Sequence, residues 1–280
     1  MKCVSKIIFL FLRRIIERTT ECMNRLSLLI LFIVLHTLNI EAQTFPNYIA
    51  HGGGAGGAIG QYIYSNSKEA LLQSIERGYT FIEIDMDTTS EGHLVASHDW
   101  KSFHATNGHP EWGDSIIPLE TFKATRMYGR FTTISIDEVV EILLEHPSVF
   151  LVTDKISNVD VLDRSLSGIR DRVYVEAFSM EDFIRLREVG YHAMYSQPAE
   201  NLAWLIIENL LDGTARIDFI ADATNDNFKE ISRLKCLAPF KVAMYTSNSK
   251  EFVDEHLGKE IDLIYTDYYN PQTGNFNWEE

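Results

Sequence analysis

The amino-acid sequence predicts an α/β protein, a single (β/α)8 barrel with an insertion after its second strand. Eight short apolar, β-branched segments recur between residues 46 and 267, and segments with the period of amphipathic helices separate them. The strands are apolar almost without interruption, which is typical of a parallel sheet buried on both faces. Eight such units favour a closed barrel. An open doubly wound sheet stays the alternative, because a sequence cannot show closure.

The order of the elements follows from these patterns. We expect strands at residues 46–51, 80–86, 148–154, 172–178, 191–196, 217–223, 240–246 and 261–267. Helices are expected near 67–78, 136–146, 158–169, 180–189, 198–211, 225–235 and 248–257. Ser67 and Ser135 are good N-caps, Glu138 completes a capping box with Ser135, and Gly78 is a good helix stop.

Residues 92–134 do not fit this alternation. HLVASHDW (93–100) predicts a short extra strand, and the polar segment after it, which contains several aromatic residues, lacks a helical period. Long connections of this kind are often functional. In a barrel, this one would lie at the C-terminal ends of the strands.

Residues 1–42 have the features of a secretory leader. Arg25 precedes an apolar run over 26–38 and a small-residue site near Ala42, with Met23 as the expected true start. An uncleaved N-terminal anchor is the alternative. We therefore expect an exported protein, periplasmic or extracellular, with a mature domain over 43–280 that has no stable membrane span and only one cysteine, Cys236.

The charge of the mature domain excludes one class of partner. Residues 43–280 contain 19 Lys and Arg against 37 Asp and Glu, a formal net charge of −18. Nucleic-acid binding needs a basic surface, so no nucleic acid is expected as a partner.

Two carboxylates and two histidines carry the chemistry of the first hundred residues. In FIEIDMD, the period of a strand places Glu83 and Asp85 on one face, where a hard divalent cation is the usual compensation for their repulsion. His51 ends the first strand before six glycines in nine residues, and His98 precedes Asp99. Two histidines near a carboxylate-bound metal form an acid–base pair suited to phosphoryl chemistry.

The glycine run contains a formal G-x-G-x-x-G, but a dinucleotide site does not fit it. About ten residues separate Gly57 from the helix at Ser67, whereas that fingerprint needs the helix to begin in the glycine turn. A Walker phosphate loop is excluded because no Lys-Ser/Thr closes the run.

From Ile49 to Trp100, the chain resembles the N-terminal signature of the glycerophosphodiester phosphodiesterases, a family of the phosphatidylinositol-phospholipase-C-like barrel superfamily. That signature is a histidine closing the first strand, Asn-Ser/Thr before a helix ending in Gly, then E-x-D, T-x-D-G and H-D. The sequence supplies His51, Asn66-Ser67, Gly78, Glu83 and Asp85, TSEG at 89–92, and His98-Asp99. VAMYTSN (242–248) and IDLIYTDYYNP (261–271) resemble the family's last two strands.

The resemblance implies hydrolysis of a small-molecule glycerophosphodiester to an alcohol and glycerol 3-phosphate. It implies His51 and His98 as catalytic acid and base, Glu83, Asp85 and Asp154 as ligands of Mg²⁺ or Ca²⁺, and Gly52, Asn66, Lys155 and Tyr245 as substrate-binding residues. In this superfamily, a hydroxyl of the substrate itself can attack first and form a cyclic phosphate that water then opens.

The chain departs from the family at two places. Gly52 stands where the family usually has a phosphate-binding Arg, so the glycine run is expected to bring backbone amides toward the phosphate instead. The third strand reads Thr153-Asp154-Lys155 where the family has acid-x-Lys. Strand alternation turns only one of Asp154 and Lys155 inward unless a bulge serves both, and Asp154 is favoured as the ligand.

These departures leave two other functions open. The first is an enzyme of the same type that acts on a different phosphodiester, in a lipid headgroup or a glycan. The second is a barrel without catalysis that binds such a group.

Overall fold

The computed structural model describes residues 48–54, 62–196, 217–221, 225–235 and 241–276. The predicted leader, the predicted helix near 198–211 and Cys236 lie outside the described residues. None of the described helices is long and apolar enough to cross a membrane.

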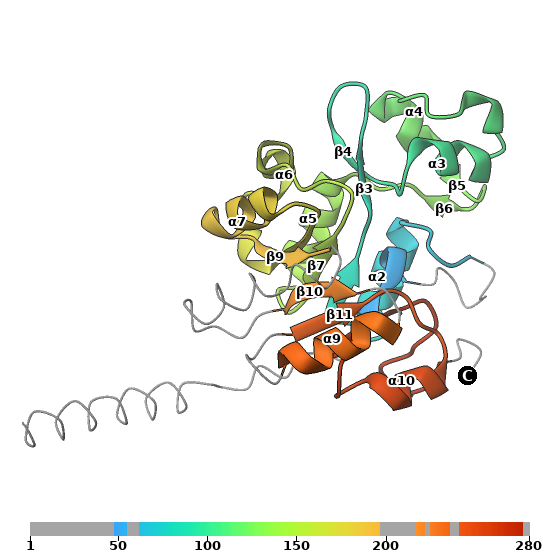
Figure 1. The fold of residues 1–280 in the computed structure, drawn as a ribbon. Helices are drawn as coiled ribbons and strands as arrows, with labels where there is room; N and C mark the ends of the chain where they lie inside the picture. Colours follow the sequence, from blue (N-terminus) through green and yellow to red (C-terminus); the bar gives the residue numbers. More distant parts are fainter. Residues whose placement is uncertain (1–47, 55–61, 197–216, 222–224, 236–240, 277–280) are drawn as a thin grey trace, which may run out of the picture. The chain divides into compact units, whose positions relative to one another are not determined.

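Eight parallel strands close into a barrel, which confirms the predicted fold class and excludes the open sheet (Figure 1). The strands are β1 (Tyr48–Ala50), β2 (Phe81–Glu83), β7 (Phe150–Thr153), β8 (Val173–Ala177), β9 (His192–Tyr195), β10 (Ile217–Ala221), β11 (Lys241–Met244) and β12 (Leu263–Thr266). Each pairs with the next in this order, and β12 pairs with β1. All eight predicted strands are present, each shorter than its apolar segment.

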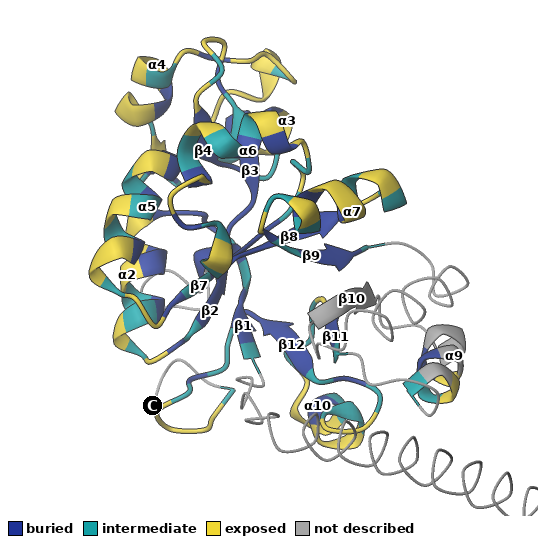
Figure 2. Cartoon of the chain, turned by 90° about the vertical axis from the view of Figure 1, so that its left-hand side faces the viewer, coloured by how far each residue is buried: buried dark blue, intermediate teal, exposed yellow. Residues whose placement is uncertain are grey.

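Helices follow most of the strands and pack on the outside of the barrel. They are α2 (Lys68–Glu76), α5 (Ile136–Glu145), α6 (Val159–Leu166), α7 (Met180–Glu188), α9 (Asn225–Lys235) and α10 (Lys250–His256). Along α5 and α7, buried faces alternate with exposed outer faces (Figure 2). The predicted caps are confirmed, since the Ser67 hydroxyl accepts from the Ala70 amide and Ser135 forms a capping box with Glu138.

The two ends of the barrel differ in polarity. Near the starts of the strands, the Phe81 ring stacks on Phe150 and contacts Tyr174, with centroids 5.0 and 5.2 Å away. Because side chains two residues apart share one side of a strand, Glu83 lies on the same side of β2 as Phe81. Aromatic rings therefore pack at the N-terminal end, and polar groups gather at the C-terminal end.

The insertion after β2 is more structured than the sequence predicts. It contains the hairpin β3 (Met86–Thr88) and β4 (Leu94–Ala96), the helices α3 (Trp100–Thr106) and α4 (Leu119–Ala124), a short 3₁₀ helix η2 (Pro110–Trp112), and the small hairpin β5 (Arg126–Met127) and β6 (Phe131–Thr132). The predicted extra strand is confirmed as β4. The prediction that the segment after it contains no helix is wrong. Helices of seven and six residues are too short to reveal a helical period.

The aromatic residues of the insertion form its own hydrophobic core. Its buried members are Val95, Trp100, Phe103, Ile117, Phe122, Met127 and Phe131. In Figure 1, α3, α4, β5 and β6 gather beside one another beyond β3 and β4. The Ser97 amide donates to the Asp85 carbonyl (3.1 Å) and the Ala96 amide to the Ile134 carbonyl (3.0 Å), so the segment before His98 is fixed to the barrel end.

Candidate active site

The register of the barrel brings the ends of four strands together. Ala50 pairs with both Ile82 and Thr266, and Glu83 pairs with Val152. The residues that follow therefore meet around a cavity of about 440 Å³. Its lining residues are His51, Tyr64, Glu83, His98, Asp154, Lys155, Glu176, Phe178, Ser196, Tyr245, Thr246 and Tyr265.

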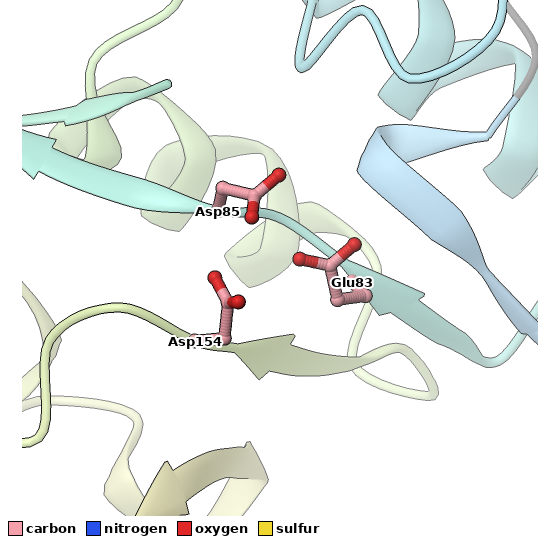
Figure 3. Close-up of side chains that lie close together, drawn as sticks. All are labelled: Glu83, Asp85 and Asp154. Atoms are coloured by element: carbon pink, nitrogen blue, oxygen red, sulfur yellow. The ribbon is translucent and has the colours of Figure 1, made fainter. Parts of the chain in front are cut away.

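Three carboxylates lie together in this part of the molecule. Glu83, Asp85 and Asp154 each offer an oxygen atom, and these atoms lie within 4.8 Å of one another. Figure 3 shows the three side chains pointing toward one another, two from the chain at the end of β2 and one from the end of β7. The predicted shared face of Glu83 and Asp85 is confirmed, although β2 itself ends at Glu83.

The cluster is electrostatically unfavourable as it stands. Burial, followed by the neighbouring charge of Asp85, raises the pKa of Glu83 well above its usual value. The same two causes raise the pKa of Asp154 to about 9. Asp154 Oδ1 is buried and has no hydrogen-bond partner among the described residues. An oxygen-only donor set with an unpaired buried acceptor fits a hard divalent cation such as Mg²⁺ or Ca²⁺.

Asp154 and Lys155 both reach the cavity, which answers the question that strand alternation leaves open. β7 ends at Thr153, and Lys155 has a positive φ of 65°, so the chain turns instead of continuing the alternation. Lys155 Nζ lies 2.9 Å from Asp154 Oδ2. A left-handed residue after the strand, not a bulge within it, presents an acid and a cation side by side.

His51 is oriented by a carboxylate at the end of β12. Its Nδ1 lies 3.0 Å from Asp267 Oδ1, which can only accept, so Nδ1 carries the proton and Nε2 is the free nitrogen. Asn248 holds Asp267 in turn, donating Nδ2–H to Asp267 Oδ2 (2.8 Å) and accepting from the Asp267 amide (2.8 Å). The imidazole is therefore fixed in orientation and tautomer.

His98 has the same arrangement within the insertion. Its Nδ1 lies 2.5 Å from Asp99 Oδ2, and Asp99 Oδ1 accepts the Ser102 amide (2.7 Å) as the N-cap of α3. Partial burial opposes ionisation, but hydrogen bonds from Ser102 and His98 lower the pKa of Asp99. His98 and Asp99 are thus held as a hydrogen-bonded unit in which Nδ1 of the imidazole faces the aspartate.

The Gly52 amide is already paired within the protein, so the phosphate contact expected of the glycine run does not come from this amide; residues 55–61, which contain the second half of the run, lie outside the described residues. The amide donates to Glu83 Oε2 (2.6 Å) and so helps to orient the carboxylate cluster. Gly52 has a φ of 57°, and a Cβ there would overlap the Tyr64 ring and lie 2.7 Å from Tyr64 Cα. Tyr64, which the sequence did not single out, fills the space beside Gly52.

The other two predicted substrate-binding residues differ in position. Asn66 is buried, and both ends of its amide bond Asp85: Nδ2 donates to Oδ2 (2.8 Å) and Oδ1 accepts the Asp85 amide (3.1 Å). Asn66 does not line the cavity and instead holds the carboxylate. Tyr245 does line the cavity and is 43% exposed, as expected for a residue that contacts substrate.

Sequence reasoning assigned no role to Asp267, Asn248 or Glu176. Asp267 and Asn248 stood within the quoted segments of the last two strands, but the hydrogen bond from His51 to Asp267 joins residues 216 positions apart, and Asn248 acts only through Asp267. Glu176 is buried in β8 and accepts from the Tyr265 hydroxyl (3.0 Å). No local pattern marks either arrangement.

Gly52→Ala is expected to destabilise the protein more than a glycine replacement in open space. Gly129 has a similar φ of 67° with nothing near its Cβ position, so Gly129→Ala measures the left-handed backbone cost alone, about 1–2 kcal/mol. Overlap with Tyr64 should add roughly 1–3 kcal/mol at Gly52. Urea denaturation of both variants tests this, and equal losses would show that the contact with Tyr64 relaxes freely.

Asp154→Asn is expected to abolish the stabilisation of the fold by divalent cations. A ligand at one hundred times its Kd stabilises the folded protein by about 2.7 kcal/mol, and loss of one of three carboxylates removes most of that affinity. Melting temperatures with and without Mg²⁺ or Ca²⁺ measure the effect. Asp160→Asn, an exposed residue of α6, is the control and should respond like the wild type. An unchanged response in Asp154→Asn would place the cation elsewhere.

Glu176→Gln is expected to flatten the pH dependence of stability. Burial is the main cause that raises the pKa of Glu176 from 4.5 to about 7. Between these values the folded protein holds a proton that the unfolded chain releases, so stability falls as the pH rises through 7, by about 3 kcal/mol in total. Unfolding free energies at pH 5 and pH 8 measure the difference, with the exposed Glu188→Gln as control. Parallel profiles for wild type and Glu176→Gln would contradict this assignment.

Several solved structures have a similar barrel fold. No family model matches the chain, and no curated protein matches it. A phosphodiesterase of Oleispira antarctica, solved with the product sn-glycerol-3-phosphate, is similar with a TM-score of 0.62 at 19% identity, covering 82% of this chain and 96% of that one.

Two further solved structures are similar in fold to this chain. A glycerophosphoryl diester phosphodiesterase of Parabacteroides distasonis has a TM-score of 0.62 at 14% identity, covering 83% of this chain and 87% of the other. A glycerophosphodiester phosphodiesterase of Thermotoga maritima has a TM-score of 0.57 at 17% identity, covering 80% and 95%. The chain therefore has the barrel fold of the glycerophosphodiester phosphodiesterases, as the signature at its N-terminus predicted.

Proposed function

We propose that this protein is a metal-dependent phosphodiesterase that hydrolyses glycerophosphodiesters to an alcohol and glycerol 3-phosphate. The observation that carries the proposal is the pairing of two histidines in one cavity, each with Nδ1 bound to an aspartate, beside a largely buried carboxylate cluster. A barrel that only bound a headgroup would not need two oriented imidazoles. The product complex of the Oleispira protein, which shares the fold, supports glycerol 3-phosphate as the product.

Glu83, Asp85 and Asp154 would hold the divalent cation, either Mg²⁺ or Ca²⁺. Bound there, it would supply Lewis-acid polarisation of the phosphate oxygens and a template for the substrate. The protein prepares these ligands with neutral donors, since Gly52 N–H bonds Glu83 and Asn66 bonds Asp85.

Lys155 is the cation that this chain itself contributes to phosphate binding. Burial opposes its charge, but Asp154 and other nearby carboxylates raise the pKa of Lys155, so the ammonium group stays protonated. It lines the cavity next to Asp154. An ammonium in this place compensates the negative charge of the diester and of the transition state.

The two histidines divide the proton transfers. One neutral imidazole takes the proton of the attacking hydroxyl at its Nε2, as the P–O bond to that oxygen forms. The other, protonated at Nε2, donates its proton to the alcohol oxygen as the P–O bond to that oxygen breaks. The attacking hydroxyl is water, or a hydroxyl of the substrate that first gives a cyclic phosphate. In the cyclic route, a second round with water opens the ring.

Asp267 and Asp99 act through the histidines. Each accepts Nδ1–H, which keeps Nε2 as the nitrogen that exchanges protons and stabilises the imidazolium when it forms. The two aspartates come from distant parts of the chain, because Asp267 follows β12 and Asp99 is the N-cap of α3. We also propose export of the mature domain, on the basis of the leader pattern in residues 23–43.

The proposal is tested on protein that begins at Gln43, with a panel of diesters in Mg²⁺ and Ca²⁺ separately. The panel contains glycerophosphocholine, glycerophosphoethanolamine, glycerophosphoinositol, an intact phospholipid and a phosphodiester-linked glycan. Release of glycerol 3-phosphate that stops with chelator is the expected result. His51→Ala and His98→Ala should each lower kcat by about 10²–10⁴-fold. His109→Ala, an exposed histidine of the insertion, should be as active as the wild type.

Two results would contradict the proposal. Turnover of the phospholipid or the glycan diester alone would keep the mechanism and replace the substrate. Tight binding of a diester without turnover in either cation would assign the cavity to binding alone.

A further inference from the structure

Tyr64 lies at the centre of the groups that the proposed mechanism uses. Its ring centroid is 4.3 Å from that of His51 and 5.5 Å from that of His98, so it contacts both imidazoles. It lines the main cavity and also a second cavity of about 200 Å³, to which α3 and β5 contribute. Tyr64 and His98 form the wall shared by these two cavities.

The hydroxyl of Tyr64 bonds the carboxylate cluster. It donates to Asp85 Oδ1 at 2.7 Å, while Asn66 Nδ2 donates to Asp85 Oδ2 at 2.8 Å. Each oxygen of Asp85 therefore receives one neutral donor. A carboxylate oxygen has a second lone pair, so Asp85 can still bind a cation in the orientation that the two donors set.

The backbone around Tyr64 is built to hold the ring in this place. Tyr64 and Asn66 both have positive φ values, 59° and 48°, which are rare for residues with side chains. The Asn66 amide donates to the Gly52 carbonyl at 2.9 Å and ties the segment to the end of β1. Because any Cβ at Gly52 would overlap Tyr64, the glycine is the condition for the position of the ring.

We propose that Tyr64 is a positioning residue with two separable roles: its hydroxyl orients Asp85 for the cation, and its ring sets the arrangement of His51 and His98. The two roles belong to two parts of one side chain, the hydroxyl and the aromatic ring, so two substitutions separate them. The second role rests on the proposed function, because it concerns the acid–base pair. The first role concerns cation binding and is measurable without substrate.

Tyr64→Phe removes the hydroxyl and keeps the ring, whereas Tyr64→Ala removes both. Calorimetric titration with Mg²⁺, and separately with Ca²⁺, should show a loss of affinity of about tenfold for both variants. At saturating cation, kcat of Tyr64→Phe should stay within about twofold of the wild type, and kcat of Tyr64→Ala should fall about tenfold or more. Rescue of kcat by phenylalanine is a result that general destabilisation would not give.

Tyr62→Phe is the matched control. Tyr62 lies two residues away, and its ring packs on Tyr128 and Phe131 without lining either cavity. It should leave both cation affinity and kcat unchanged. Melting temperatures of all three variants show whether each remains folded at the assay temperature.

Each alternative result contradicts one defined part of the proposal for Tyr64. Unchanged cation affinity in Tyr64→Phe overturns the role of the hydroxyl, and wild-type kcat in Tyr64→Ala overturns the role of the ring. A Tyr64→Ala variant faster than the wild type would mean that the ring obstructs the cavity. If the wild type binds no divalent cation, the cation site of the proposed function fails and the hydroxyl role fails with it. If the wild type binds the cation and Tyr64→Phe binds it equally well, only the role assigned to the Tyr64 hydroxyl is wrong, and the proposed cation site stands.

Discussion

The repulsion among three carboxylates at the end of the barrel, two of them buried and one partly buried, is the constraint on which the rest of the site depends. Glu83, Asp85 and Asp154 meet because the register of β2 and β7 brings the ends of these strands side by side. Burial, and after it the charge of neighbouring Asp85, raises the pKa values of Glu83 and Asp154, and Asp154 Oδ1 has no partner in the described part of the chain. Such an arrangement fits a bound cation, and the proposed cation beside two oriented histidines is suited to phosphodiester hydrolysis.

The surroundings of the cluster consist of neutral donors and aspartate-bound histidines. Gly52, Asn66 and Tyr64 donate hydrogen bonds to Glu83 and Asp85 as neutral groups, so these donors leave the negative charge of the cluster for the proposed cation. Asp267 and Asp99, which lie far apart in the sequence, each accept a hydrogen bond from one imidazole and fix it. The insertion contributes to the site through His98, whose position depends on the aromatic core beneath α3 and on the attachment of Ser97 to Asp85.

Much of this could be predicted from sequence, and the remainder could not for identifiable reasons. The strands, most caps and the E-x-D pair follow from local period and chemistry, so their positions are confirmed. The orientations of Asp154 and Lys155 depend on a positive φ at Lys155, and a lysine in the sequence does not predict that backbone conformation. The bonds of Asp267 to His51 and of Tyr64 to Asp85 depend on closure of the barrel and on a loop conformation. The pairing of the Gly52 amide with Glu83 joins residues 31 positions apart, so the sequence could not show that this amide of the glycine run is already occupied.

The most direct test of the account is the location of a bound cation by anomalous scattering from crystals grown with Mn²⁺. The account predicts one Mn²⁺ ion within coordinating distance of carboxylate oxygens of Glu83, Asp85 and Asp154, with Tyr64 still bonded to Asp85. A cluster without Mn²⁺, or an ion bound elsewhere in the cavity, would contradict the claim that this cation site organises the protein's chemistry.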